Sequence, residues 1–127
     1  MRHTFEIELN GKTYTCRTTF QAIDAFEDKT GLAITEAWLQ LADGKMKFST
    51  IATAVWAAIN GERVFQGQKP MIWDTVGQLV QEHGFTVCAL YASQFFANSM
   101  PSQDKGTSEP EGEKKSTESI SDGSQPT

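Results

Sequence analysis

The fold of this chain is decided by residues 5–17, which read FEIELNGKTYTCR. Apolar and acidic residues alternate up to Leu9, and this period of two is typical of a strand that is buried on one face. Asn10-Gly11 supplies the two residues of positive φ that a type I′ turn requires, and a second alternating segment follows the turn. The stretch therefore predicts a two-stranded antiparallel hairpin.

The two-residue turn also fixes the register of the hairpin, because the strands must pair outward from it. One face is expected to hold the mostly apolar pairs Leu9/Lys12, Ile7/Tyr14 and Phe5/Cys16, and the other face the polar pairs Glu8/Thr13 and Glu6/Thr15. Two strands alone are only marginally stable in water. The apolar face therefore needs a cover from the rest of the chain.

A helix is predicted directly after the hairpin. Thr18 and Gln21 have the spacing of a capping box, and Gly31 can close the helix in a left-handed conformation. Apolar residues recur at helical intervals between these ends, at Phe20, Ile23 and Phe26. We expect this helix to lie across the apolar face of the hairpin.

Two further amphipathic helices are predicted in the middle of the chain. The first is expected to be capped by Thr35 and to end at Gly44, and the second to be capped by Ser49 and to end at Asn60-Gly61. Their apolar stripes are Ile34/Trp38/Leu41 and Ile51/Val55/Ile59.

A linker at residues 62–69 is expected to precede two last helices. One should start near Pro70, which suits the first helical turn, and end at His83-Gly84, and the other should be capped by Thr86. Their apolar faces are Ile72/Val76/Leu79/Val80 and Val87/Leu90/Tyr91/Phe95. The sequence thus predicts an α+β fold in which the hairpin packs on a bundle of about four to five short α-helices.

Residues 1–98 are expected to form a single domain, and residues 99–127 a polar, acidic and disordered tail. The only sizeable apolar side chains of the tail are Met100 and Ile120, so it cannot offset the entropy cost of its own ordering. The chain has a formal net charge of −5. The tail contributes −3 of this charge, which leaves −2 for residues 1–98.

Composition argues against several classes of partner. Lys and Arg are scattered in an acidic chain, which argues against nucleic acid. No apolar run reaches the roughly 20 residues of a membrane span. Cys16 and Cys88 come without a recognisable export signal, so we expect two reduced, buried thiols and a cytoplasmic location.

The sequence predicts no catalytic residue, no cofactor site and no metal site, and hence not an enzyme. His83 is expected to stabilise a helix end, because the carbonyl-rich terminus attracts a histidine. Glu6 and Glu8 point together from one strand, but this spacing is also that of a solvated face. His83 and Cys88 have no second Cys or His near them that would complete a zinc site.

Aromatic residues are numerous for a body of this size. Most must lie in the core, but some aromatic area can remain for a partner, because Trp, Tyr and Phe are enriched at interface cores. The candidate partner-binding residues are Trp38, Trp56, Trp73, Phe95 and Phe96. Both locations, core and interface, remain open for Trp56 and Phe96.

The order of these motifs resembles that of small proteins encoded among phage tail and gene-transfer-agent tail genes, known as tail assembly chaperones or tail tube proteins. The resemblance covers about residues 4–98 and rests on diffuse motifs that are structural and not catalytic. They are Asn10-Gly11-Lys12-Thr13-Tyr14, Arg17-Thr18-Thr19-Phe20-Gln21-Ala22-Ile23, Phe26-Glu27, Gly31-Leu32, residues 51–61, and the helix from Val76-Gly77 to Gly84-Phe85.

The resemblance implies a non-catalytic role in building a tail in the bacterial cytoplasm. The expected partner is the helical tape-measure protein, with the tail tube protein as a second candidate and self-association into a homo-oligomer also allowed. Exposed apolar stripes on a tape-measure chain would need a reversible cover, which a small aromatic-rich domain can provide. Two alternatives are a structural tail component that stays in the particle and a small acidic regulatory adaptor.

Overall fold

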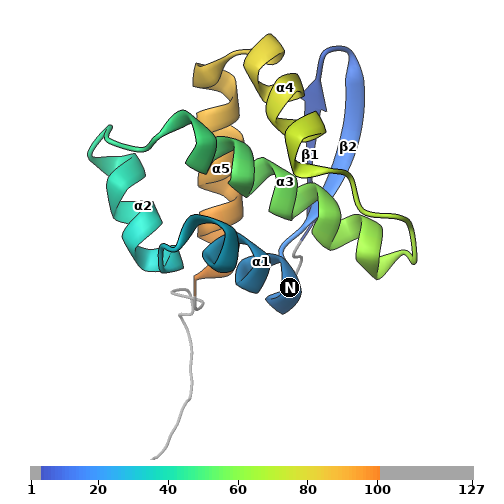
Figure 1. Cartoon of the computed structure of the whole chain (residues 1–127), viewed down its shortest axis with the longest axis horizontal. Helices are drawn as coiled ribbons and strands as arrows, with labels where there is room; N and C mark the ends of the chain where they lie inside the picture. The colour runs from blue at the N-terminus through green and yellow to red at the C-terminus, as the bar shows by residue number, and fades with distance from the viewer. Residues whose placement is uncertain (1–3, 101–127) are drawn as a thin grey trace, which may run out of the picture.

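The computed structural model describes residues 4–100, which form a two-stranded sheet and five helices (Figure 1). In chain order the elements are β1 (Thr4–Leu9), β2 (Lys12–Arg17), α1 (Phe20–Thr30), α2 (Ile34–Ala42), α3 (Phe48–Phe65), α4 (Trp73–His83) and α5 (Phe85–Ser99). The predicted α+β class with an N-terminal hairpin is confirmed. The predicted disorder of the tail concerns residues 101–127, which lie outside the described part, and α5 extends to Ser99, just past the predicted domain end.

The hairpin has the predicted register throughout, with Leu9 opposite Lys12, Ile7 opposite Tyr14 and Phe5 opposite Cys16. The turn is also as predicted, because Asn10 and Gly11 have φ values of 53° and 86°. The same face of the hairpin is buried at Ile7, Leu9 and Cys16, whereas Glu6, Glu8, Thr13 and Thr15 are exposed.

The cover of the hairpin differs from the prediction. α3 packs against β2 and α4 against β1, whereas α1 packs mainly on α3 (Figure 1). The prediction that α1 covers the apolar face of the hairpin is therefore wrong, because α3 and α4 cover it instead. The reason is that the apolar stripe assumed for α1 is not buried throughout: Phe26 is buried, but Phe20 is 78% exposed.

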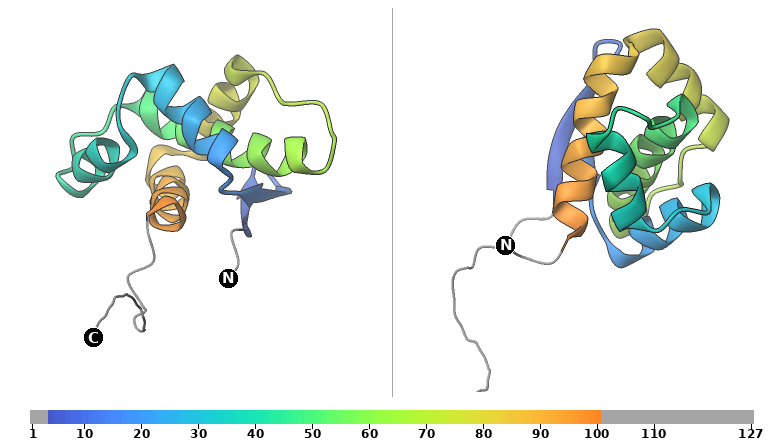
Figure 2. Two further views of the ribbon diagram at one scale, coloured as in Figure 1. Left: turned by 90° about the horizontal axis from the view of Figure 1, so that it is seen from below. Right: turned by 90° about the vertical axis from the view of Figure 1, so that its left-hand side faces the viewer.

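α3 is the centre of the fold. Ten of its 18 residues are buried, including the predicted stripe Ile51, Val55 and Ile59. α1, α4, α5 and β2 all pack on it, and the two views of Figure 2 show these elements arranged around it. A helix enclosed in this way needs small residues on several sides, and α3 has them at Ala52, Ala54, Ala57 and Ala58.

Several predicted helix boundaries are wrong. α1 is capped by Thr19, whose hydroxyl accepts from Ala22 N at 3.0 Å, and not by Thr18. α2, α3, α4 and α5 have Ala33, Lys47, Ile72 and Gly84 at their N-caps, where Thr35, Ser49, Pro70 and Thr86 were expected near the start. For α2 the physical reason is visible, because the Glu27 carboxylate of α1 accepts from Ile34 N at 2.8 Å and replaces a local cap.

α3 does not stop at Asn60-Gly61, so residues 62–65 of the predicted linker are helical. Gly61 is buried inside the helix, and a Cβ atom there would lie far within contact distance of the Arg17 carbonyl oxygen. The glycine thus serves a close approach of β2 to α3 and does not end the helix.

α5 buries a different face from the one predicted. Cys88, Ala92, Phe95 and Phe96 are buried, whereas Leu90 is 64% and Val87 40% exposed. Phe26 of α1 packs edge-on against Phe96 and tilted against Phe95, with ring centroids 5.4 and 5.9 Å apart. These three rings form the aromatic centre of the core beside α3.

Both cysteines are free and buried, as predicted. Burial, with a contribution from the negative charge of Glu62, raises the pKa of the Cys16 thiol to about 12, and burial raises the pKa of Cys88 to about 11. Neither thiol is therefore ionised at neutral pH, which makes both poor nucleophiles. None of the helices among residues 4–100 is both long and apolar enough to cross a membrane.

Replacing Gly61 by alanine is expected to lower the free energy of unfolding by about 1–3 kcal/mol, because the new methyl group forces the Arg17 backbone away from α3. Gly77 of α4 is the matched control, since a Cβ there meets no atom within 4 Å. Gly77→Ala should raise stability by about 0.5–1 kcal/mol through helix propensity. Urea unfolding measures the free energy of unfolding of both variants. Equal changes in the two variants would contradict a close approach of the Arg17 carbonyl to Gly61.

Candidate functional site

An apolar groove of about 250 Å³ lies between α1 and the C-terminal half of α3. Its floor and walls consist mainly of carbon, because most lining residues are small or apolar. The lining residues are Thr19, Gln21, Ala22, Ala25, Trp56, Ala57, Asn60, Gly61, Val64 and Pro70. Four of them are alanine or glycine at buried or half-buried positions, so two neighbouring helices leave a trough between them that no side chain fills.

The far wall of the groove is the segment between α3 and α4, and α3 holds it in place. Asn60 donates to the Met71 carbonyl at 3.0 Å and accepts from Met71 N at 2.8 Å. The Trp56 indole donates to the same carbonyl at 3.1 Å, and Arg63 Nε donates to the Lys69 carbonyl at 2.6 Å. Hydrogen bonds from α3 to Lys69 and Met71, the neighbours of Pro70 in the chain, therefore hold Pro70 against α3.

Trp56 is half-buried and presents part of its ring to the groove. Its polar N–H is satisfied inside the protein by Met71, so the accessible part of the side chain is apolar surface. A partner that covers this ring needs no hydrogen-bond acceptor for the indole.

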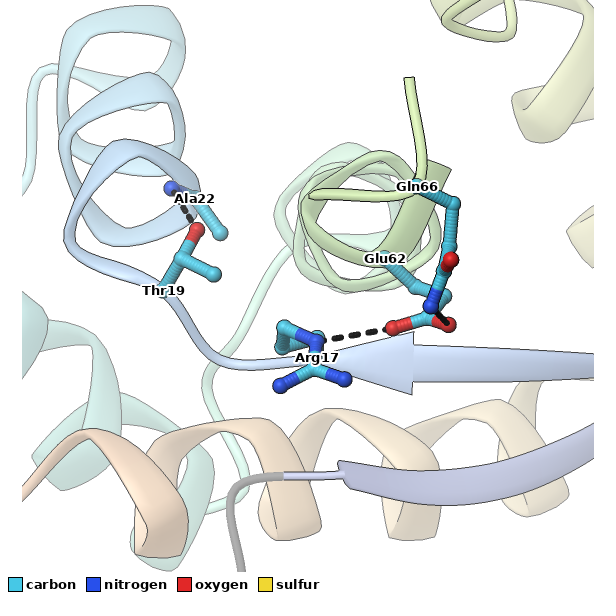
Figure 3. A network of polar contacts seen from close by, with 5 residues as sticks. All are labelled: Arg17, Thr19, Ala22, Glu62 and Gln66. Atoms are coloured by element: carbon cyan, nitrogen blue, oxygen red, sulfur yellow. Dashed lines mark hydrogen bonds and ion pairs between the residues drawn. The ribbon is translucent and has the colours of Figure 1, made fainter. Parts of the chain in front are cut away.

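A polar cluster of Arg17, Glu62 and Gln66 lies between the end of β2 and the last turns of α3 (Figure 3). Arg17 Nε donates to Glu62 Oε1 at 2.8 Å, and Gln66 Nε2 donates to Glu62 Oε2 at 2.9 Å. The bond from Arg17 lowers the pKa of the Glu62 carboxyl, with Gln66 acting in the same direction against the effect of burial. The cluster ties the end of β2 to the last turns of α3, next to the Thr19 cap that begins α1.

Large apolar side chains are exposed close to this groove. Val64 lines it and is 54% exposed, while Phe20 lies between the lining residues Thr19 and Gln21 and is 78% exposed. Phe65 follows Val64, is 61% exposed and lies against the Arg17 guanidinium, 3.7 Å from the ring centroid. Such a concentration of exposed apolar residues is a mark of a protein-binding surface.

The structure does not bring the five predicted partner-binding residues together. Phe95 and Phe96 are 0% exposed, so their prediction as contact residues is wrong: the rotation of α5 places both in the core. Trp38 is half-buried and packs edge-on against Phe96, with ring centroids 6.2 Å apart. Trp56 alone of the five lines the groove.

Trp73 is half-buried in a different part of the surface, between α1, α3 and the start of α4. Its N–H donates to the Thr53 hydroxyl at 2.9 Å, and Lys29 Nζ lies 4.4 Å from its ring centroid. It borders a polar hollow of about 320 Å³ with Lys29 and Lys47, and a separate one of about 300 Å³ with Phe48. Trp73 is thus a packing residue with an accessible edge.

Val64, Pro70 and the alanines of α1 were missed from the sequence. The reason is the misplaced end of α3: a helix that stops at Gly61 leaves Val64 in a linker. With α3 continued to Phe65, the residues Trp56, Asn60 and Val64 recur every four positions on one helical face. This four-residue spacing is the sequence pattern that indicates a shared surface for Trp56, Asn60 and Val64.

His83 lies in the last turn of α4 as expected, but its contact is with the hairpin. Asn10 N donates to His83 Nδ1 at 3.2 Å, and the imidazole stacks on Tyr91, 6.3 Å between centroids. Tyr91 in turn bonds the backbone of Glu8, accepting from its N and donating to its carbonyl. Within residues 4–100, no three Asp, Glu, His or Cys side chains converge where they could hold a metal ion.

Comparison of the chain with protein-family models, with curated proteins and with solved structures gives no match. The geometry of the groove and its surroundings is therefore the basis for assigning a function.

Stability should depend on the charge of Glu62. Because the folded-state pKa of this carboxyl is lowered, its contribution is complete above the unfolded value of 4.5 and is lost as the pH falls through the lower folded value. We expect Glu62→Gln to cost about 1 kcal/mol at pH 7, and the difference from the unsubstituted protein to shrink as the pH falls below 4.5 and through the lowered folded-state pKa of Glu62. Urea unfolding over this acid range and at pH 7 measures the difference, and a difference that does not change with pH would argue against the ion pair as its origin.

Proposed function

We propose that this chain is a non-catalytic tail assembly chaperone that binds the tape-measure protein through the groove between α1 and α3. The observation that carries the proposal is the groove itself, an apolar trough lined by Trp56 and Val64, with exposed Phe65 and Phe20 close to it. Such a surface favours an apolar partner side chain over a polar substrate. The sequence resemblance supplies the phage tail context.

An amphipathic helix is the partner that fits this surface. A helix presents apolar residues at intervals of three and four, so one anchor can enter the groove while its neighbours cover the residues outside it. The groove is bounded by Gln21 and Asn60, whose amides can bond polar groups at the edge of the partner helix. A tape-measure protein is expected to contain such helices along its length.

The size of the groove indicates how strong this binding can be. Burial of one leucine-sized anchor contributes about 1.5–3 kcal/mol, whereas a dissociation constant of about 1 μM corresponds to about 8 kcal/mol. A single anchor is therefore insufficient. The partner must also cover Phe20, Phe65 and Val64, and reversible binding of this kind suits a protein that is displaced when tube subunits assemble.

The carboxyl and imidazole groups of the folded part do not suggest catalysis. Glu6 and Glu8 are exposed on the outer face of the hairpin, and His83 bonds the hairpin turn. Both thiols are buried with raised pKa values. A binding role therefore has more support from the geometry than an enzymatic one.

Val64→Glu should weaken binding to the tape-measure protein at least about tenfold, because it places a charge where an apolar side chain would be buried. Trp56→Ala should act in the same direction by removing the largest apolar side chain that lines the groove. The matched control is Leu39→Glu on α2, since Leu39 is 63% exposed and does not line the groove. The tape-measure protein is co-expressed with this chain, separated from it and titrated with each variant in isothermal titration calorimetry, which measures the affinities. Circular dichroism checks that each variant is folded.

Unchanged affinity of Val64→Glu, or equal loss with Leu39→Glu, would remove the groove from the binding surface. The absence of any binding by the unsubstituted protein would refute the chaperone proposal as a whole.

A further inference from the structure

The outer face of α5 is unlike every other helix surface of the described domain. None of the 15 residues of α5 is Asp, Glu, Lys or Arg, whereas each of the other four helices carries at least one of them. Five of the six exposed residues of the helix form one stripe, which we call the α5 face: Thr86, Val87, Leu90, Gln94 and Ala97. The sixth, Phe85, lies off this stripe and stacks on Phe48. Leu90 at its middle is 64% exposed.

The depletion of charge on this face matters because 21% of the chain is charged. Charged residues are characteristically rare at the centre of protein interfaces. An exposed helix face without any charge, with a leucine at its centre and small residues toward its ends, therefore has the composition of a contact surface. Beside this face, the Tyr91 hydroxyl bonds the backbone of Glu8 on β1.

We infer that the α5 face binds the same face of a second copy of this chain, as an antiparallel pair about a two-fold axis at Leu90. In this arrangement Leu90 meets its own counterpart, and Thr86 and Gln94, each four residues away, meet one another. The apolar centre and the two polar pairs are then matched at the same time. The middle of the stripe, from Thr86 to Gln94, is thus complementary to itself.

Electrostatics favours a second copy and this orientation. Two copies of a chain of net charge −5 repel one another wherever their acidic surfaces meet, and the α5 face is the helix surface without that penalty. α5 ends at Ser99, from which residues 99–127 continue with a net charge of −3. Antiparallel helices place the two C-terminal ends of α5, where these residues begin, at opposite ends of the dimer, whereas parallel helices would place them side by side.

The pairing should be weak. A helix of 15 residues is about 22 Å long, and a single helix pair of this length falls in the class of small, transient interfaces. We expect a dissociation constant on the order of 10–100 μM. Self-association of this strength would be populated at the concentrations used for structural work and lost on dilution.

The dimer would have a consequence for binding, and this part rests on the proposed function. In the right-hand view of Figure 2, α5 runs along one edge of the molecule, whereas α1 lies toward the other. A pair joined through α5 therefore leaves both α1–α3 grooves open and turned outward. The two grooves of one dimer can bind two apolar helix faces of the same tape-measure chain, which raises the apparent affinity without any new type of contact.

Sedimentation velocity of the full chain without any partner, from about 1 to about 500 μM, tests the inference independently of the proposed function. The expected result is a concentration-dependent monomer–dimer equilibrium. Leu90→Glu should raise the dissociation constant at least about tenfold, because it sets two like charges against each other at the axis. Leu39→Glu, which alters an equally exposed leucine on α2, should leave it unchanged.

A mixing experiment identifies the axis itself. Leu90→Glu and Leu90→Lys should each be monomeric alone and should form a heterodimer when mixed, since a two-fold axis at residue 90 places the two new charges opposite one another. A monomer at every concentration, a dimer that Leu90→Glu does not weaken, or the absence of a heterodimer in the mixture would each overturn the inference.

Discussion

The approach of the Arg17 carbonyl to Gly61 is the contact on which the rest of the structure depends. It joins the end of the hairpin to the C-terminal half of α3, and only a residue without a side chain allows it. From this point the chain passes through Thr18 to the cap at Thr19 and enters α1. The direction of α1 along α3, and with it the groove, follows from how closely β2 lies against Gly61.

The groove exists because the residues that face each other across α1 and α3 are small. Ala22 and Ala25 on α1 oppose Ala57 and Gly61 on α3, so the backbones approach while the space above them stays unfilled. In most cores this space would be occupied by a larger side chain, since interiors are packed to high density. Here the bonds of Asn60 to Met71 hold the segment that carries Pro70, the far wall of the groove, against α3.

The sequence predicted the local structure well where short-range rules decide it. The Asn10-Gly11 turn, the register of the hairpin, the left-handed cap at Gly31 and the buried stripe of α3 all follow from turn chemistry and periodicity, and the structure confirms them. Tertiary contacts decided the rest. The local sequence Asn60-Gly61 predicts the end of a helix, but in the structure Gly61 allows the backbone of β2 to lie close to α3.

The candidate site was only partly predictable for the same reason. Aromatic enrichment at interfaces makes Trp56 a candidate partner-binding residue, and Trp56 does line the groove. The enrichment of aromatic residues at interfaces also made Phe95 and Phe96 candidates, and for these two residues it is misleading. In the structure Phe26 packs on both rings and Trp38 packs on Phe96, and both phenylalanines are buried.

An NMR titration of the labelled full chain with a helical fragment of the tape-measure protein tests whether the groove is the binding surface. The Trp56 indole N–H and the amides of Ala22, Ala25 and Gly61 should shift, because they lie around one trough. Shifts confined to the hairpin or to α2, or an unchanged spectrum at saturating fragment, would contradict a groove that binds an apolar anchor.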